Sequence, residues 1–239
     1  MTELIRIPVG IVNCYLLRLG HTSVLVDCAN PGSEEKIVEA LGRHGLAPDN
    51  LRMILLTHNH PDHSGTAAWF REHYGLPIAM HPEDIVVGPL KQEGLGGLIL
   101  GAGTKLVMGG THEVLPDIAL EGGQSLKEYG IPADVLHLPG HTAGSVGLLL
   151  DGRRLVCGDL YMNFVGPHLA YIAEDFDRMR NSERKLLARP VDIVFPGHGR
   201  PFRFARVTEE AEGRARTKMP LKHPKQADCM DCPNTQGKP

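Results

Sequence analysis

The densest group of metal-ligand residue types in the chain lies directly after the apolar run 53–56. It holds three imidazoles and one carboxylate within six residues, namely His58, His60, Asp62 and His63. Three more candidates each stand beside a glycine, namely His141, Asp159 and His198. Zinc accepts imidazole and carboxylate ligands without thiolates. These side chains are about what two divalent ions need once water fills the remaining positions.

Two adjacent cations would make this cluster a hydrolytic centre. A catalytic zinc takes about three protein ligands and leaves one position for water. A water shared by two cations ionises near neutral pH, and the hydroxide can attack a carbonyl that the metals polarise. The residue types therefore predict a metal-bound hydroxide held beside a substrate carbonyl.

The spacing divides the cluster into two groups. His58 and His60 are two positions apart in extended backbone, so their side chains face the same way. Asp62 and His63 follow Pro61, which bends the chain away, and they can serve a second ion nearby. The remaining ligands stand at strand ends next to glycine, where loops carry function on a rigid scaffold.

The string His58-x-His60-x-Asp62-His63, followed in order by His141, Asp159 and His198, resembles the ligand pattern of the metallo-β-lactamase superfamily. The most similar branch contains glyoxalase II (hydroxyacylglutathione hydrolase) and related thioesterases and lactonases. Segments 13–16 and 139–145 and the strand that ends in Asp27 match the same pattern. The resemblance covers about residues 4–202 and implies an α/β fold, the four-layer αββα sandwich.

The resemblance also implies how the ligands divide between two ions. Site 1 would consist of His58, His60 and His141. Site 2 would consist of Asp62, His63 and His198. Asp159 would bridge the two ions, and Asp62 and Asp159 would be the catalytic carboxylates. The expected metal is Zn²⁺, with iron or manganese as alternatives. Asp27 and Thr57 are candidates to hydrogen-bond to metal-bound imidazoles, and a turn cap toward residues 30–32 is the alternative for Asp27.

Two departures from the glyoxalase II branch bear on the substrate. About 40 residues follow His198, and they lack the pattern of that branch's helical glutathione-binding domain. After Asp159 the chain continues Leu-Tyr-Met-Asn-Phe instead of running into Gly-Cys-Gly-Arg. We therefore expect a small thioester or lactone-type ester. Tyr161 and His168 are the candidate substrate contacts, and an ordinary structural role is the alternative for both.

The same ligand string leaves a second reaction class open. A mononuclear iron sulfur dioxygenase resembling persulfide dioxygenase would use His58, His141 and Asp159, with open positions for oxygen and substrate. A diiron flavoprotein is less favoured, because that group tends to place Glu at position 60. A nucleic-acid processing enzyme would need basic grooves. A metal-stabilised protein without activity would not need two complete ligand sets.

Composition indicates a globular protein that acts on a small molecule. The 239 residues are 42% hydrophobic and 22% charged, and the net charge is −3. This balance offers no attraction to nucleic acid or to anionic membranes. The chain has no apolar run of about 18 residues and no secretory pattern, so we expect neither a spanning helix nor export. Cysteine usage favours a cytoplasmic setting, and a homodimer stays open.

Apolar periodicity predicts one hydrolase domain over residues 1–205 and a polar tail or appendage over 206–239. Strands are expected within 4–28 and at 52–56, 77–80, 117–121, 125–128, 134–138, 145–150, 154–158 and 191–195. Helices are expected at 33–43, 65–74, 82–91 and 177–188, with Ser33 and Ser64 as caps.

Two further segments have no assigned role in the predicted chemistry. The Gly-rich stretch 92–111 is expected to be either an irregular loop or a lid over the active site. Cys229 and Cys232 have the spacing of a redox or zinc-ligand pair, but they lie in the polar tail without a second pair. We interpret them as an exposed pair that is incidental or weakly metal-binding.

Overall fold

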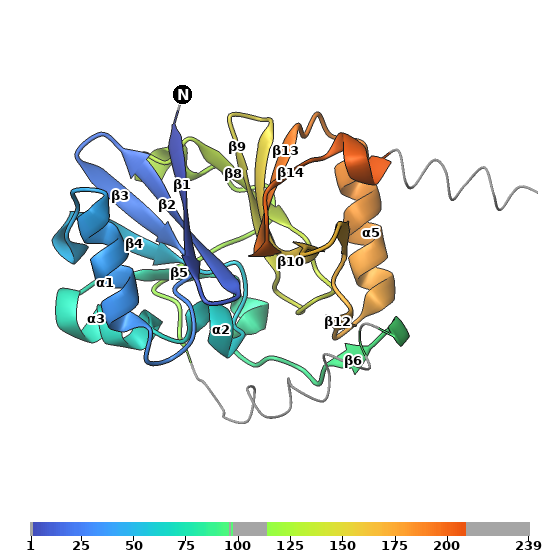
Figure 1. Cartoon of the computed structure of the whole chain (residues 1–239), viewed down its shortest axis with the longest axis horizontal. Helices are drawn as coiled ribbons and strands as arrows, with labels where there is room; N and C mark the ends of the chain where they lie inside the picture. The colour runs from blue at the N-terminus through green and yellow to red at the C-terminus, as the bar shows by residue number, and fades with distance from the viewer. Residues whose placement is uncertain (1, 96, 98–113, 209–239) are drawn as a thin grey trace, which may run out of the picture.

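The computed structural model describes residues 2–95, 97 and 114–208. Its main feature is a mixed β-sheet that curls into two halves (Figure 1). The first half contains β1 (Glu3–Val9), β2 (Val12–Leu19), β3 (Thr22–Val26), β4 (Leu51–Leu55), β5 (Ile78–Met80) and β7 (Ile118–Ala119). The second half contains β8 (Ala133–His137), β9 (Val146–Leu150), β10 (Arg154–Asn163), β11 (Pro167–Leu169), β13 (Ile193–Gly199) and β14 (Phe202–Arg203).

The order of the main strands is β7-β5-β4-β3-β2-β13-β10-β9-β8. The two halves are joined where β2 pairs with β13 in an antiparallel manner, with Val12 opposite His198. A separate small sheet pairs β6 (Lys91–Gln92) with β12 (Ile172–Ala173). The join at β2 and β13 brings strand ends from both halves to one edge, where the predicted ligands lie.

The longer helices α1 (Glu34–Arg43), α3 (Ala67–Tyr74) and α5 (Phe176–Leu187) cover the outer faces of the sheet halves (Figure 1). The short α2 (Pro61–Ser64) lies in the segment after β4, and 3-10 turns form at η1 (Pro48–Asn50), η2 (Pro82–Asp84) and η3 (Leu126–Tyr129). No described helix combines the length and the apolarity needed to cross a membrane.

Three apolar clusters define the layers. Ile37 of α1 and Phe70 of α3 pack with residues of β2 to β5, on the outer face of the first half. Met179 and Leu186 of α5 pack in the same way with the second half. Tyr15 belongs to the third cluster, in which β2, β3 and β4 meet β8 and β9. This helix–sheet–sheet–helix order confirms the predicted αββα sandwich.

The predicted helix at 82–91 was wrong, because tertiary contacts replace its hydrogen bonds. Only the 3-10 turn η2 forms, and the chain then extends toward β6. A helix would need the Gly88 N–H to donate to the Asp84 carbonyl. Instead the Gly88 N–H donates to Glu174 Oε1, and the Asp84 carbonyl accepts from Asn59 Nδ2 at 3.1 Å.

Two smaller predictions were also wrong. The expected strand 125–128 is the 3-10 turn η3, which ends at Gly130 in the left-handed region. Ser64 does not cap the second helix. It is the last residue of α2, and its hydroxyl donates to the His60 carbonyl at 3.0 Å. Most of the stretch 92–111 and of the tail 206–239, with Cys229 and Cys232, lies outside the described residues.

Candidate metal centre

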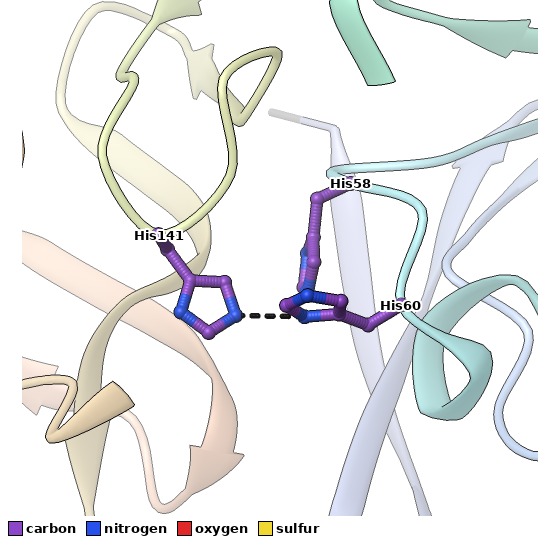
Figure 2. A group of neighbouring side chains, drawn as sticks. All are labelled: His58, His60 and His141. Atoms are coloured by element: carbon purple, nitrogen blue, oxygen red, sulfur yellow. Dashed lines mark hydrogen bonds between the residues drawn. The ribbon is translucent and has the colours of Figure 1, made fainter. Parts of the chain in front are cut away.

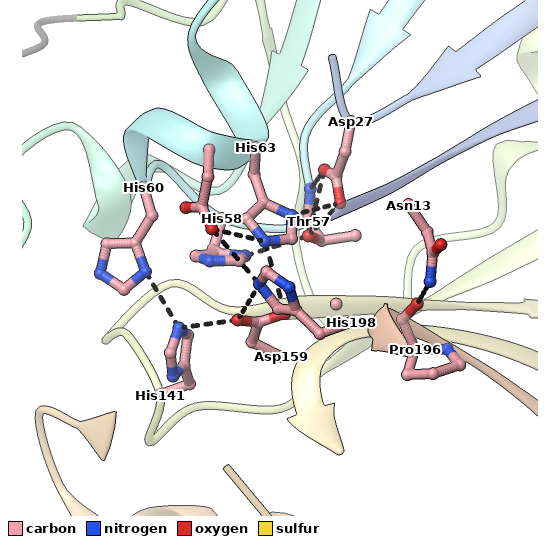
Figure 3. Close-up of polar contacts among 12 residues, drawn as sticks. Asn13, Asp27, Thr57, His58, His60, His63, His141, Asp159, Pro196 and His198 are labelled. Carbon is pink, nitrogen blue, oxygen red and sulfur yellow. Dashed lines mark hydrogen bonds and ion pairs between the residues drawn. The ribbon is translucent and has the colours of Figure 1, made fainter. Parts of the chain in front are cut away.

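The structure brings all the predicted ligands together at the edge where the two sheet halves meet (Figure 3). Four of them follow β4 and continue into α2. His141 lies in the loop between β8 and β9, while Asp159 and His198 lie on the parallel neighbours β10 and β13. All are buried except Asp62, whose side chain is 18% exposed.

The ligand atoms converge in overlapping groups, within each of which they lie no more than 4.8 Å apart. Two of these groups are the triads expected for site 1 and for site 2. The Asp159 carboxylate lies between them. Its Oδ1 is 3.4 Å from His63 Nε2 in site 2, and its Oδ2 is 3.6 Å from His141 Nε2 in site 1. This arrangement has the geometry of two sites that share one carboxylate.

The imidazoles of site 1 face one another (Figure 2). His60 Nδ1 lies 2.9 Å from His141 Nε2, and the His58 and His60 rings are nearly perpendicular at 4.7 Å. Two of the three side chains come from the first sheet half and one from the second. The triad therefore exists only because the two halves are held at a fixed separation.

Hydrogen bonds donated by Nδ1 orient four of the five ligand imidazoles. His141 donates to the Ile172 carbonyl at 2.7 Å, and His198 donates to the Ile11 carbonyl at 3.0 Å. His63 donates to Asp27 Oδ2 at 2.8 Å. With Nδ1 as the donor, Nε2 is the nitrogen of each ring that faces the centre, and it can bind a metal once it carries no proton.

Asp27 and Thr57 support the centre as the sequence predicted. Asp27 has a left-handed φ of 58° and accepts hydrogen bonds from Thr57 N at 2.8 Å and from Thr57 Oγ1 at 2.8 Å. Because the Thr57 hydroxyl proton is used there, Oγ1 is free to accept from His58 Nδ1, which lies 3.1 Å away. One buried carboxylate thus orients a ligand of site 2 directly and a ligand of site 1 through Thr57.

The protonation of the two sites differs. Burial lowers the pKa of His58, of His60 (to about 3) and of His141, so the imidazoles of site 1 are neutral. Burial acts in the same direction on His63 and His198, but the nearby carboxylates outweigh it. Asp159 above all raises the pKa of His63 and brings that of His198 to about 10.

The donor set fits divalent cations. His58 Nε2 and Asp62 Oδ1 are buried and have no hydrogen-bond partner within the described part of the chain. Burial opposes ionisation of Asp62 and Asp159, but the imidazoles of site 2 keep both pKa values low, that of Asp62 at about 2. Unpartnered nitrogen lone pairs beside ionised carboxylates are what a hard or borderline metal ion requires.

Glycine at two positions permits the close approach of β10 and β13. A Cβ added at Gly197 would lie 2.2 Å from Asp159 Oδ1 and 2.6 Å from His63 Cε1. Gly158 has a φ of +51°, and a Cβ there would lie 2.7 Å from Thr57 Oγ1. Any larger residue at either position would displace the ligands or their support.

Side chains of β2 hold the segment that carries His198. Asn13 Nδ2 donates to the carbonyls of Pro196 at 2.9 Å and Gly199 at 2.8 Å, as Figure 3 shows in part. The Tyr15 hydroxyl donates to the same Pro196 carbonyl at 2.7 Å. The sequence drew attention to this segment only through the family resemblance and did not reveal this role.

The two candidate substrate contacts lie in different surroundings. Tyr161 is fully buried, its hydroxyl donates to Glu183 Oε1 of α5 at 3.1 Å, and its ring packs edge-on against Phe202. This placement favours the packing role. His168 is half-buried on β11 and stacks on Tyr171 with ring centroids 4.2 Å apart. A substrate contact by His168 stays a prediction.

A separate group outside the centre contains His81, Glu83 and His137. The two imidazole rings stack at 4.3 Å with only 14° between their planes. Lone pairs of imidazole lie in the ring plane, so two stacked rings cannot direct them at one ion. This group therefore lacks the geometry of a metal site.

Comparison with known proteins places the chain in a family. Residues 7–198 match the model of the metallo-beta-lactamase superfamily. The chain is 33% identical over 175 residues to a hydroxyacylglutathione hydrolase of Vibrio cholerae, which covers 72% of this chain and 57% of that protein. It is 29% identical over 203 residues to hydroxyacylglutathione hydrolase GloC of Haemophilus influenzae, covering 82% and 90%.

A solved structure in a di-iron-bound form superposes with a TM-score of 0.62 at 29% identity, covering 86% of this chain and 96% of that one. The family match spans most of the chain, and the ligand pattern lies within it. The chain belongs to the metallo-beta-lactamase superfamily, a family of metal-dependent hydrolases with His/Asp metal sites.

Proposed function

We propose that this protein is a dinuclear metal-dependent hydrolase that cleaves a small thioester or lactone-type ester. The observation that carries the proposal is the pair of complete ligand triads that share the Asp159 carboxylate. A purely structural metal site is closed and needs only one set of ligands. Two adjacent three-residue sets are the arrangement that leaves positions for water and substrate.

The two sites, Asp159 and Asp62 would have different roles in the reaction. Two divalent cations bound at sites 1 and 2 would polarise the scissile carbonyl and lower the pKa of a water between them. Asp159 would fix the separation of the sites. Asp62 is the most exposed ligand, and its Oδ2 lies 3.3 Å from His198 Nε2 while its Oδ1 has no hydrogen-bond partner among the described residues. Asp62 Oδ1 would orient the attacking water.

The relatives support a thioester or a related ester without fixing which. The hydroxyacylglutathione hydrolases are named for a glutathione thioester, and this chain spans 57% of the length of the Vibrio cholerae protein. For this chain we propose the wider class of thioesters and lactone-type esters. Zn²⁺ is the proposed metal, with iron as the alternative that the di-iron-bound neighbour supports. We also propose a cytoplasmic enzyme that acts on small molecules, with no nucleic-acid or membrane partner.

The test combines metal analysis with a substrate panel. Protein purified without added metal should contain about two zinc ions per chain and should hydrolyse thioesters or lactones. One iron per chain with oxygen consumption on a persulfide would support instead the mononuclear dioxygenase, with His58, His141 and Asp159 as ligands. Two bound metals with no turnover of thioesters, lactones or β-lactams would contradict the proposal.

A further inference from the structure

A buried carboxylate outside the ligand set joins the two loops that supply site 1. Asp84, at the end of η2, has no exposed surface. Its Oδ2 accepts hydrogen bonds from Asn59 N at 3.2 Å and from Thr142 Oγ1 at 2.8 Å. Its Oδ1 accepts from Gly144 N at 2.6 Å, and its own carbonyl accepts from Asn59 Nδ2 at 3.1 Å.

The donors that bond to Asp84 lie next to ligands of site 1 in the chain. Asn59 stands between the ligands His58 and His60, on the loop after β4. Thr142 follows the ligand His141, on the loop between β8 and β9. The two loops belong to different halves of the sheet, and Asp84 hydrogen-bonds to the backbone of both.

We propose that Asp84 is a positioning residue that holds the His58–His60 loop and the His141 loop at the separation site 1 requires, and so sets the metal affinity of site 1. This inference rests on the proposed metal centre and extends it to a residue that neither the ligand pattern nor the sequence identified.

The chemistry of the contact requires a carboxylate. Two N–H groups and one hydroxyl converge on it, and a carboxylate has an acceptor oxygen for each side, whereas an amide has only one. No lysine or arginine forms an ion pair with Asp84 in the described part of the chain. A buried acid without a cationic partner is costly, and burial accordingly raises the pKa of Asp84 to about 6. If this position served packing alone, an apolar residue would fill it without the free-energy cost of burying a carboxylate.

Site 2 depends on other supports, so the effect of Asp84 should be confined to site 1. His63 is oriented by Asp27, and His198 by the Ile11 carbonyl. Within the part of the chain that the structure describes, Asp84 hydrogen-bonds to Asn59, Thr142 and Gly144 and to neither of these imidazoles nor their supports. A loss of affinity limited to one of two ions would therefore distinguish positioning from general destabilisation.

Two variants break the link from opposite sides. In Asp84→Asn the amide NH₂ must face at least one N–H or O–H donor, so at least one hydrogen bond is lost. In Gly144→Ala the added Cβ would lie 2.7 Å from Asp84 Oδ1 and displace the carboxylate. The matched control is Asp117→Asn, since Asp117 Oδ2 accepts from Ile78 N at 2.8 Å and from Arg71, away from the ligand loops.

The experiment measures Zn²⁺ binding to the full chain by competition with a chelator, without reference to turnover. Each variant is also made with His198→Ala, which removes a ligand of site 2 and isolates site 1. We expect Asp84→Asn and Gly144→Ala to weaken the site 1 ion by about 10–100-fold, the range for residues that orient metal ligands. The site 2 ion and the Asp117→Asn control should be unchanged.

Wild-type affinity for both ions in either folded variant would overturn the proposal, and so would equal weakening of both ions. If Asp84→Asn does not fold, Gly144→Ala decides by the same criterion. A result on Zn²⁺ affinity stands whether or not any ester is hydrolysed. Failure of the proposed reaction is therefore separate from failure of the positioning role.

Discussion

Site 1 and site 2 are built from similar side chains but differ in charge. The imidazoles of site 1 are neutral because burial lowers their pKa values, most clearly that of His60, to about 3. In site 2 the carboxylates of Asp159 and Asp62 overcome burial and raise the pKa of His198 to about 10. A cation entering site 1 meets free lone pairs, whereas one entering site 2 must first displace protons. The ligand carboxylates that lie beside the imidazoles of site 2 therefore make its protonation different from that of site 1.

Asp159→Ala should have the largest effect, because Asp159 is the one side chain that belongs to both sites. Its loss removes the shared ligand and the charge that holds protons on His63 and His198. We expect kcat/KM to fall by about 10³-fold or more, which corresponds to several kcal/mol of transition-state stabilisation. Steady-state kinetics on the best substrate of the panel give the measurement.

Asp192→Ala is the control for that variant, since Asp192 pairs with Arg153 on the surface. Near wild-type turnover in Asp159→Ala would remove the bridging role and leave the two sites independent.

His60→Ala and His198→Ala should separate the sites. Each variant removes one ligand, so each should lose one metal ion per chain and keep the other, with activity falling together with metal content. We expect the affinity of the affected site to fall by more than about 100-fold, beyond the range for indirect supports. Metal content after dialysis gives the measurement, with His73→Gln as a surface control. Full occupancy in His60→Ala would take His60 out of site 1.

Asp27→Asn should affect site 2 more than site 1. Asp27 orients His63 directly but reaches His58 only through Thr57. We expect a loss of about 10–100-fold in Zn²⁺ affinity at site 2 and a smaller loss at site 1. Chelator competition in the His198→Ala and His60→Ala backgrounds assigns each loss. An equal loss of affinity at both sites would mean that Asp27 orients His58 through Thr57 as strongly as it orients His63 directly.

The last expected effect is on the free energy of unfolding at alkaline pH before metal binds. The pKa of His198 is raised to about 10 in the folded protein and is near 6.5 in an unfolded chain. Its stabilising contribution is therefore complete below about pH 6.5 and is lost as the pH rises through about 10. Urea unfolding of metal-stripped protein should show the free energy falling between pH 7 and pH 9, by up to about 1.4 kcal/mol per pH unit.

The His198→Gln variant should make this alkaline limb shallower, because one of the two imidazoles with a raised pKa is gone, while His73→Gln should leave it unchanged. A limb of wild-type slope in His198→Gln would show that the raised pKa belongs to another group.

Sequence reasoning was most successful where the signal is local. The six-residue ligand cluster, the strand before it and the amphipathic helix α1 depend on residue types at fixed spacing, and all are present as predicted. It failed at 82–91, where the Asp84 carbonyl and the Gly88 N–H are bonded to Asn59 and Glu174. Those partners lie about 25 and 86 positions away in the chain, so no local pattern reports them.

The amino-acid sequence by itself determined which atoms could bind a metal, since donor chemistry belongs to the residue type. It also determined the alternation of strands and helices, which follows from apolar periodicity. Only the tertiary structure decided that the two triads converge, that Asp159 lies between them and that Asp84 links the two loops that supply site 1. The distances among these groups, and the protons that the imidazoles hold, depend on strand pairing and burial, which exist only once the two sheet halves have closed on each other.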